Sequence, residues 1–256
     1  MCFAFDAHPP DLPADLARPR LAGGAAAELL ELTSADGTRF AAALAQAPDA
    51  SGPGVVVLPD VRGLYRFYVE LTERFVQAGH HAIAIDYFGR TAGAGERGED
   101  FEYMPHVMQT RVAQVQADAG AALAALRERT GASSAATVGF CFGGSQSFAA
   151  AASAELALDR VVGFYGRLVP AREGAPAPIE LAPQLRCPVL GLFGGADEAI
   201  PPDHVEAFER GLREGGVEHE IHVYPGAPHS FFDRAFAEHA EACDDAWRRM
   251  LGFLGG

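Results

Sequence analysis

The sharpest local signal of the fold is the stretch Gly139-Phe140-Cys141-Phe142-Gly143-Gly144. It follows an apolar, β-branched run at 135–140 and precedes a helix-compatible run at 143–155. Glycines two residues before and after Cys141 permit a sharp strand-to-helix turn, where bulkier side chains would collide. Such a turn places the sulfur at the positive end of a helix, which favours the thiolate. The pattern predicts a nucleophilic cysteine; a buried structural thiol between packing glycines is the alternative.

Apolar runs alternate with helical patterns along most of the chain. Short continuous apolar runs such as 54–58 are typical of strands buried on both faces. The expected strands are 28–34, 38–45, 54–58, 81–85, 135–140, 160–165, 187–193 and 217–224, and the expected helices are 66–78, 106–129, 143–155, 203–214 and 234–253. Asp36-Gly37 predicts a hairpin between the first two strands. The alternation predicts an α/β fold with a mostly parallel sheet of about eight strands and helices on both faces.

The chain is expected to form one catalytic domain over residues 27–256. Residues 1–26 are rich in Pro, Asp and Ala and are expected to lie on the surface as a lead-in. No Ser/Gly-rich linker divides the rest, and the Pro-rich stretch 170–183 fits a long loop between strands. Apolar residues at 49% and charged residues at 21% exclude a disordered or coiled-coil chain.

The charge balance excludes several kinds of chemistry and partner. Twenty basic residues against 34 acidic ones give a net charge of −14, and all twenty are arginine. Without lysine the chain has no Schiff-base lysine, P-loop lysine or Ser-Lys dyad. A strongly acidic protein is also poorly suited to bind nucleic acid or anionic membranes.

The cysteines and the N-terminus favour a cytoplasmic protein. Four widely spaced cysteines form no CxxC pair and suit a reducing compartment. The first residues show no secretory signal pattern. Residues 130–154 carry no charge, but their Gly, Ser and Ala content indicates a buried strand–turn–helix unit and no membrane span. No metal-ligand spacing and no dinucleotide-binding glycine motif is present, so no metal or cofactor is expected.

Two further polar residues follow later strands. Asp197 comes after the strand at 187–193, and His229 comes after the strand at 217–224. The carboxyl ends of parallel strands share one edge of the sheet, where active sites lie. Alone, Asp197 could be a turn or capping residue and His229 a solvent-facing loop residue. Their order after Cys141 predicts a catalytic triad of nucleophile, acid and histidine.

The sequence resembles the dienelactone hydrolases, a family with the α/β-hydrolase fold. The resemblance begins near residue 28 and rests on GFCFGG at 139–144, GGADEAIP at 194–201 and YPGAPHSFF at 224–232. It implies that Cys141 is the nucleophile, His229 the base and Asp197 its orienting carboxylate. It also implies an oxyanion hole formed by the backbone N–H groups of Phe142 and Val61.

The sequence departs from the family at two kinds of position, one that controls protonation of the cysteine and one that binds the substrate carboxylate. Asp60 stands where the family has a glutamate that controls cysteine protonation, though it could equally be a loop-forming residue. Arg90 matches the first of two arginines that bind the substrate carboxylate. Asp233 occupies the position of the second, and Arg234 follows it. Arg62 and Arg66 are the candidate replacements for the missing cation.

The sequence therefore predicts a hydrolase that acts on a small ester or lactone through an acyl-enzyme, as a monomer or homodimer. An acidic side chain at position 233 is expected to repel anionic substrates and to favour uncharged ones. The alternatives are a non-catalytic protein of this fold that binds a small ligand or a partner, and an acyl transferase or thioesterase with the same triad.

Overall fold

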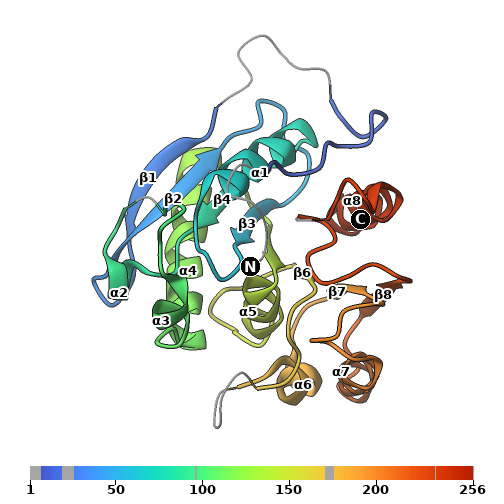
Figure 1. Cartoon of the computed structure of the whole chain (residues 1–256). Helices are drawn as coiled ribbons and strands as arrows, with labels where there is room; N and C mark the ends of the chain where they lie inside the picture. The colour runs from blue at the N-terminus through green and yellow to red at the C-terminus, as the bar shows by residue number, and fades with distance from the viewer. Residues whose placement is uncertain (1–6, 19–25, 96, 171–175, 234, 256) are drawn as a thin grey trace.

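Eight strands form one sheet in the order β1-β2-β4-β3-β5-β6-β7-β8 (Figure 1). The computed structural model describes residues 7–18, 26–95, 97–170, 176–233 and 235–255. The strands are β1 (Glu28–Thr33), β2 (Arg39–Ala45), β3 (Gly54–Leu58), β4 (Ala82–Ile85), β5 (Ala135–Phe140), β6 (Arg160–Phe164), β7 (Val189–Gly194) and β8 (His219–Tyr224). β2 pairs antiparallel with β1 and β4, and the other neighbours are parallel. The predicted mostly parallel sheet is confirmed.

Helices cover both faces of the sheet, as the alternating pattern predicted. They are α1 (Arg66–Gln77), α2 (Gly89–Ala92), α3 (Tyr103–Val107), α4 (Val112–Thr130), α5 (Phe142–Ala150), α6 (Pro178–Leu181), the 3-10 turn η1 (Ala182–Gln184), α7 (Pro202–Glu214) and α8 (Ala240–Gly255). α1 and α8 lie on one face, where the rings of Phe75 and Trp247 are 5.7 Å apart. α4 lies on the other face, with α5 beside it.

β3 shows why a continuous apolar run marks a central strand. All five of its residues are buried, and it lies between β4 and β5. Val55 and Val57 pack in the same core as the apolar residues of α1, whereas Val56 and Leu58 pack with those of α4. Successive side chains point to opposite faces of a strand, so a strand covered on both faces must be apolar throughout.

Three predicted helices differ by several residues in the structure, and the one expected at 143–155 ends at Ala150 as α5. The helix expected at 106–129 is divided into α3 and α4, because Arg111 adopts an extended backbone and its N–H is bound by the Gln114 side chain at 3.0 Å. Met108, which an unbroken amphipathic helix over 106–129 would place on its apolar face, is 52% exposed. The helix expected from 234 begins at Ala240, since turns occupy the preceding described residues.

The described part of the N-terminal segment, residues 7–18, lies against α1 and α8. Leu12 is buried in the core, Asp11 binds Arg74 of α1 at 2.9 Å, and Asp15 binds Arg248 of α8 at 2.6 Å. The remaining residues of the predicted lead-in, apart from Ala26, lie outside the described residues. The surface position expected for the whole lead-in stays a prediction.

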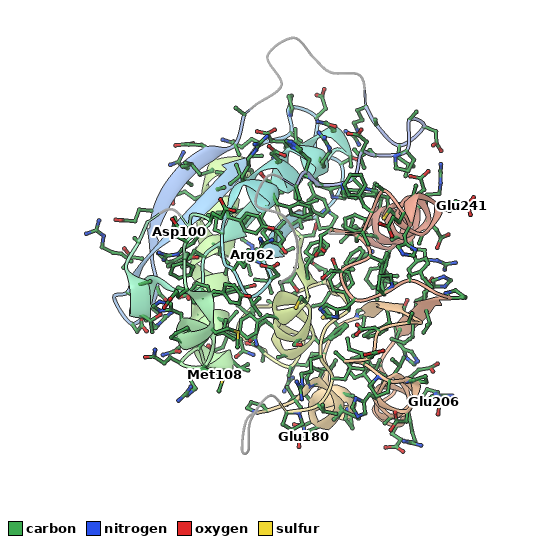
Figure 2. All side chains as sticks on the ribbon, viewed as in Figure 1. Arg62, Asp100, Met108, Glu180, Glu206 and Glu241 are labelled. Atoms are coloured by element: carbon green, nitrogen blue, oxygen red, sulfur yellow. The ribbon has the colours of Figure 1, made fainter. Side chains whose placement is uncertain are left out.

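Acidic side chains lie on the outer faces of several helices. Glu180 of α6, Glu206 of α7 and Glu241 of α8 are exposed and lie at the periphery, whereas Arg62 lies near the centre of the view (Figure 2).

The uncharged stretch 130–154 forms β5, the turn after it and α5. Among the described helices, none combines the length and apolarity that crossing a membrane would require.

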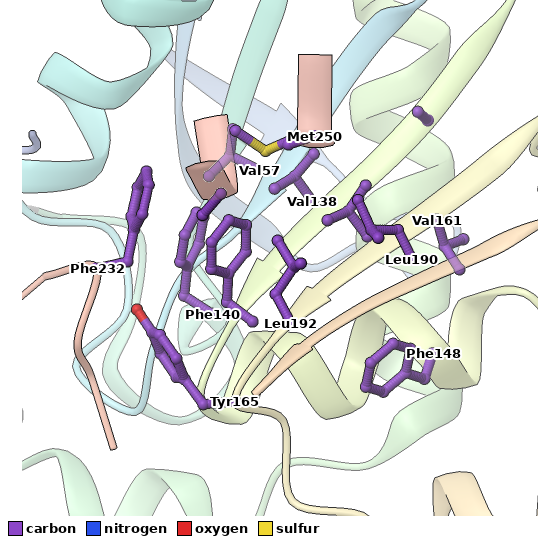
Figure 3. Packing of buried hydrophobic residues seen from close by; sticks show 14 of the residues in the cluster. Val57, Val138, Phe140, Phe148, Val161, Tyr165, Leu190, Leu192, Phe232 and Met250 are labelled. Atoms are coloured by element: carbon purple, nitrogen blue, oxygen red, sulfur yellow. The ribbon is translucent and has the colours of Figure 1, made fainter. Parts of the chain in front are cut away.

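Aromatic rings fill the core beside the carboxyl end of the central strands (Figure 3). The ring of Phe140 at the end of β5 stacks on that of Phe164 at 4.7 Å, and Phe232 packs against both. Phe232 belongs to the segment after β8. This packing ties that segment to the end of β5, and aromatic pairs of this kind add stability beyond their burial.

The turn after β5 requires glycine because α5 begins directly against β3. A Cβ on Gly143 would lie 2.0 Å from the carbonyl oxygen of Leu58 and 2.3 Å from that of Pro59. A Cβ on Gly139 would lie 2.0 Å from the carbonyl oxygen of Gly143. These distances are far below van der Waals contact, so the backbones approach this closely only without side chains.

We expect Gly143→Ala to lower the free energy of unfolding by roughly 3 kcal/mol, because the added methyl group meets backbone that cannot move aside. Gly252→Ala is the control, since its Cβ would meet nothing within 4 Å in α8; it should raise stability by up to about 1 kcal/mol. Urea unfolding of both variants measures the difference. Equal stability of the two variants would contradict the close approach.

Candidate active site

Cys141 occupies the turn between β5 and α5. Its backbone has φ 53° and ψ −112°, a conformation that few residues other than glycine adopt. Its N–H donates to the carbonyl of Phe164, the last residue of β6, at 3.0 Å. The side chain is half-buried. The turn thus presents the thiol at the carboxyl edge of the sheet, in the position that the motif predicted.

His229 lies between Cys141 and Asp197. Its Nε2 is 3.2 Å from the Cys141 Sγ, and its Nδ1 is 2.6 Å from the Asp197 Oδ2. The Asp197 side chain is 1% exposed, and its other oxygen accepts the N–H of Ala199 at 2.9 Å. The three residues therefore form one continuous chain of contacts, although 88 residues separate the cysteine from the histidine.

The loop after β3 leaves one backbone donor available. The N–H of Asp60 donates to the Tyr68 hydroxyl. The N–H of Arg62 donates to the Asp60 carboxylate, and that of Gly63 donates to the Asp60 carbonyl. The N–H of Leu64 donates to the carboxylate of Asp86. Within the described ranges, the Val61 N–H has no protein acceptor, and neither does the Phe142 N–H that opens α5. These are the two groups predicted for the oxyanion hole, and unpaired N–H groups can bind a developing negative charge.

Asp60 is fully buried and organises this loop. One oxygen accepts the N–H of Arg62 at 2.9 Å, and the other lies 3.6 Å from the Arg62 Nε. The guanidinium of Arg62 also lies over the ring of Tyr65, 4.3 Å from its centroid. The loop-forming role considered for Asp60 is therefore present in the structure, and its control of the cysteine stays a prediction.

Asp233, expected from the sequence to repel anionic substrates, lies inside the protein. Its side chain is buried, and Oδ2 accepts the hydroxyl of Tyr165 at 2.9 Å. The ring of Tyr165 in turn packs against the His229 ring at 5.2 Å. Burial raises the pKa of Tyr165 well above its usual value, which keeps its hydroxyl a donor. The Asp233 carboxylate is thus held by Tyr165 inside the protein, and its repulsion of an anionic substrate stays a prediction.

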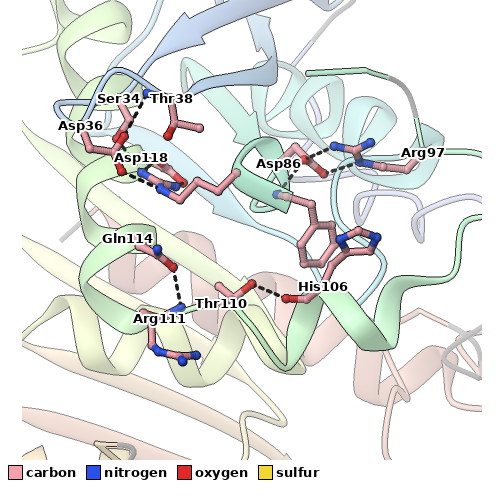
Figure 4. Close-up of polar contacts among 12 residues, drawn as sticks. Ser34, Asp36, Thr38, Asp86, Arg97, His106, Thr110, Arg111, Gln114 and Asp118 are labelled. Atoms are coloured by element: carbon pink, nitrogen blue, oxygen red, sulfur yellow. Dashed lines mark hydrogen bonds and ion pairs between the residues drawn. The ribbon is translucent and has the colours of Figure 1, made fainter. Parts of the chain in front are cut away.

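Arg90 is bound by two carboxylates, those of Asp36 and Asp118, which are labelled in Figure 4. Its guanidinium binds the buried carboxylate of Asp118 through two nitrogens, at 2.6 and 2.9 Å, and it also binds Asp36 at 2.7 Å. These contacts anchor the β1–β2 hairpin to α4. A guanidinium bound on three nitrogens has little capacity for a substrate carboxylate, so the structure does not support substrate binding by Arg90.

The other candidate arginines differ in their surroundings. Arg62 belongs to the loop with Val61 and its side chain is 16% exposed, so it borders the candidate oxyanion hole. Arg66 forms an exposed ion pair with Glu70, one turn along α1. Arg234 lies outside the described residues.

The sequence reasoning did not single out Tyr87 and Tyr165 as site residues. Each follows the end of a strand at the same sheet edge as Cys141, β4 and β6 respectively, and that position was the available signal. Across the described residues, no group of three or more His, Cys, Asp or Glu side chains is arranged to hold a metal ion.

A thiol on a strained strand-to-helix turn, followed along the chain by an acid and a histidine after later strands of the same sheet, defines an α/β-hydrolase. The chain belongs to the dienelactone hydrolase family, whose model matches residues 40–256. It is a hydrolase of this family and acts on small substrates.

Known proteins of similar sequence and structure agree with this assignment. A Yersinia pestis protein named "Putative carboxymethylenebutenolidase" is 32% identical over 208 residues, which cover 79% of this chain and 77% of that protein. The crystal structure titled "Putative Dienelactone Hydrolase" from Klebsiella pneumoniae superposes with a TM-score of 0.76 at 30% identity, covering 89% of this chain and 98% of that one. The dienelactone hydrolase-like promiscuous phosphotriesterase P91, from metagenomic libraries, superposes with a TM-score of 0.72 at 26% identity, covering 90% and 98%.

We expect Arg90→Gln to lower the free energy of unfolding at pH 7 by roughly 3 kcal/mol, because it leaves the carboxylate of Asp118 buried without its cation. Burial already raises the pKa of Asp118, so the loss of stability should be smaller at an acidic pH at which this carboxyl is protonated. Denaturant unfolding at both pH values measures this effect.

Arg129→Gln is the control for Arg90→Gln, since it breaks an exposed pair with Glu28 and should cost at most about 1 kcal/mol. The ratio of kcat/KM for an anionic lactone to that for a neutral ester should be unchanged in Arg90→Gln. A selective loss with the anionic lactone would restore Arg90 as a substrate-binding residue.

Proposed function

We propose that this protein hydrolyses a small ester or lactone through an acyl-enzyme on Cys141. The proposal is carried by the contact chain of Cys141 Sγ, His229 and Asp197, at 3.2 and 2.6 Å. A base within hydrogen-bonding reach of a nucleophile, itself oriented by a buried carboxylate, is the arrangement that covalent catalysis requires.

The reaction begins when His229 Nε2 takes the thiol proton and the sulfur attacks the ester carbonyl. The carbonyl oxygen gains negative charge and is stabilised by the N–H groups of Val61 and Phe142. The intermediate collapses to a thioester, and the departing alkoxide receives the proton held by His229. A water molecule then loses a proton to His229 and attacks the thioester, which releases the acid and restores the thiol. Throughout, Asp197 orients the imidazole and stabilises its charged form.

An uncharged substrate is the better supported class. Arg90 is bound by two carboxylates, and Arg62 lies 3.6 Å from the carboxylate of Asp60. Because these carboxylates neutralise the charge of Arg90 and Arg62, neither arginine would attract an anionic substrate strongly. P91, a structural relative, is by its title a phosphotriesterase, and phosphotriesters carry no charge. The described cysteines are free thiols, which supports a reducing compartment such as the cytoplasm.

We expect iodoacetamide to alkylate Cys141 in preference to Cys187 and Cys243, and to abolish hydrolysis of an aryl ester. Burial raises the pKa of Cys187 to about 11 and that of Cys243 to about 12, so at pH 8 at most ~0.1% of either is thiolate. Mass spectrometry of tryptic peptides, taken alongside residual activity, locates the modification. Cys141→Ala should lose turnover entirely, whereas Cys187→Ala should keep it. An active Cys141→Ala enzyme would overturn the proposal.

We expect Asp197→Asn to reduce kcat by roughly 10²–10⁴ while the protein stays folded, because the imidazole loses the charge that orients it. Glu198→Gln is the matched control, since this neighbouring side chain is exposed and should retain wild-type rates. Steady-state kinetics and a far-UV spectrum of each variant suffice. A large loss in Glu198→Gln together with a near-normal Asp197→Asn would move the role to the next residue.

A further inference from the structure

Tyr87 contacts both halves of the candidate oxyanion hole. It follows β4, its side chain is buried, and its hydroxyl donates to the carbonyl of Pro59 at 2.8 Å. Its ring meets the ring of Phe142 edge-to-face, with centroids 5.3 Å apart. Pro59 lies two residues before Val61, and Phe142 itself supplies the second amide. One side chain therefore bridges the two segments whose N–H groups would hold the oxyanion.

The backbone on either side of Tyr87 is itself fixed. The carboxylate of Asp86 accepts the N–H of Phe88 at 2.8 Å and that of Leu64 at 3.1 Å. Arg97 binds the same carboxylate through two nitrogens, as Figure 4 shows. The loop after β3 is thus held near its two ends, at Pro59 by the Tyr87 hydroxyl and at Leu64 by Asp86. Val61 lies between these two points.

The hydrogen bond from Tyr87 to the Pro59 carbonyl depends on the tyrosine hydroxyl. A phenylalanine would keep the packing against Phe142 but would leave the Pro59 carbonyl without this donor. Burial raises the pKa of Tyr87 well above its usual value, so the hydroxyl stays protonated and donates at neutral pH. The geometry of donors around an oxyanion matters over fractions of an ångström, because their effect depends on preorganisation.

We propose that Tyr87 is a positioning residue that sets the separation of the Val61 and Phe142 amides, and that its hydroxyl thereby increases the rate of ester hydrolysis. The inference rests on the proposed function and adds a residue to it. In this role Tyr87 acts through the Pro59 carbonyl and the Phe142 ring.

The test compares two reactions of the same thiol in Tyr87→Phe. Hydrolysis of 4-nitrophenyl acetate passes through an oxyanion, whereas alkylation of Cys141 by iodoacetamide displaces iodide at a tetrahedral carbon and forms none. We expect kcat and kcat/KM for the ester to fall about tenfold with KM unchanged, which is less than the loss of an entire donor. The alkylation rate should stay within about twofold of wild type, since the thiol and His229 are untouched. Inhibition by a simple aldehyde, whose adduct with Cys141 carries the same oxyanion, should weaken by a similar factor.

Tyr224→Phe is the matched control, because it removes another buried tyrosine hydroxyl, bound to Asp245 at 3.0 Å, away from the loop after β3. It should keep wild-type ester kinetics. Wild-type ester kinetics in Tyr87→Phe would overturn the inference, as would an equal loss in alkylation and hydrolysis, which would indicate a general distortion of the site. Full turnover in Cys141→Ala would instead overturn the proposed function, so the two failures are distinguishable.

Discussion

The left-handed backbone of Cys141 is the constraint on which the rest of the site depends. Holding a residue other than glycine in such a conformation costs on the order of 1–3 kcal/mol, and the surrounding structure must supply this energy. The strand β5, which ends directly before Cys141, and its neighbour β6 hold this backbone. The close approach of α5 to β3 and the aromatic packing of Phe140, Phe164 and Phe232 hold it further. Because the same packing also anchors the segment after β8, the position of the thiol and that of the histidine are fixed together.

Much of the fold and the three central site residues could be predicted because they depend on local pattern and chain order. Continuous apolar runs mark strands buried on both faces, and residues that directly follow parallel strands must share one edge. The division between α3 and α4 was missed because it depends on the backbone of Arg111 and one side-chain cap. The partners of Arg90 and the burial of Asp233 were also missed. Both depend on contacts between residues 28 and 68 positions apart in the chain, which no local pattern reveals.

The absence of lysine from the sequence has a counterpart in how the structure treats its buried acids. Arg97 meets Asp86, and Arg90 meets Asp118, each through two guanidinium nitrogens. A planar fork matches both oxygens of a carboxylate, which a single ammonium group cannot do. In a chain with a net charge of −14, these paired contacts neutralise two of the carboxylates that the fold places inside it.

The number of residues between Cys141 and His229 also affects when, during synthesis, the proposed nucleophile and its base can come together. Cys141 lies near the middle of the sequence, whereas His229 comes 88 residues later and follows the outermost strand of the sheet. During synthesis the thiol leaves the ribosome several seconds before its base, at typical rates of ~5–20 residues per second. Under the proposed mechanism, the cysteine of a growing chain therefore lacks its base until β7 and β8 have joined the sheet. The proposed reaction would then begin only when the fold is complete, so that the nascent chain is not acylated before it can release the product.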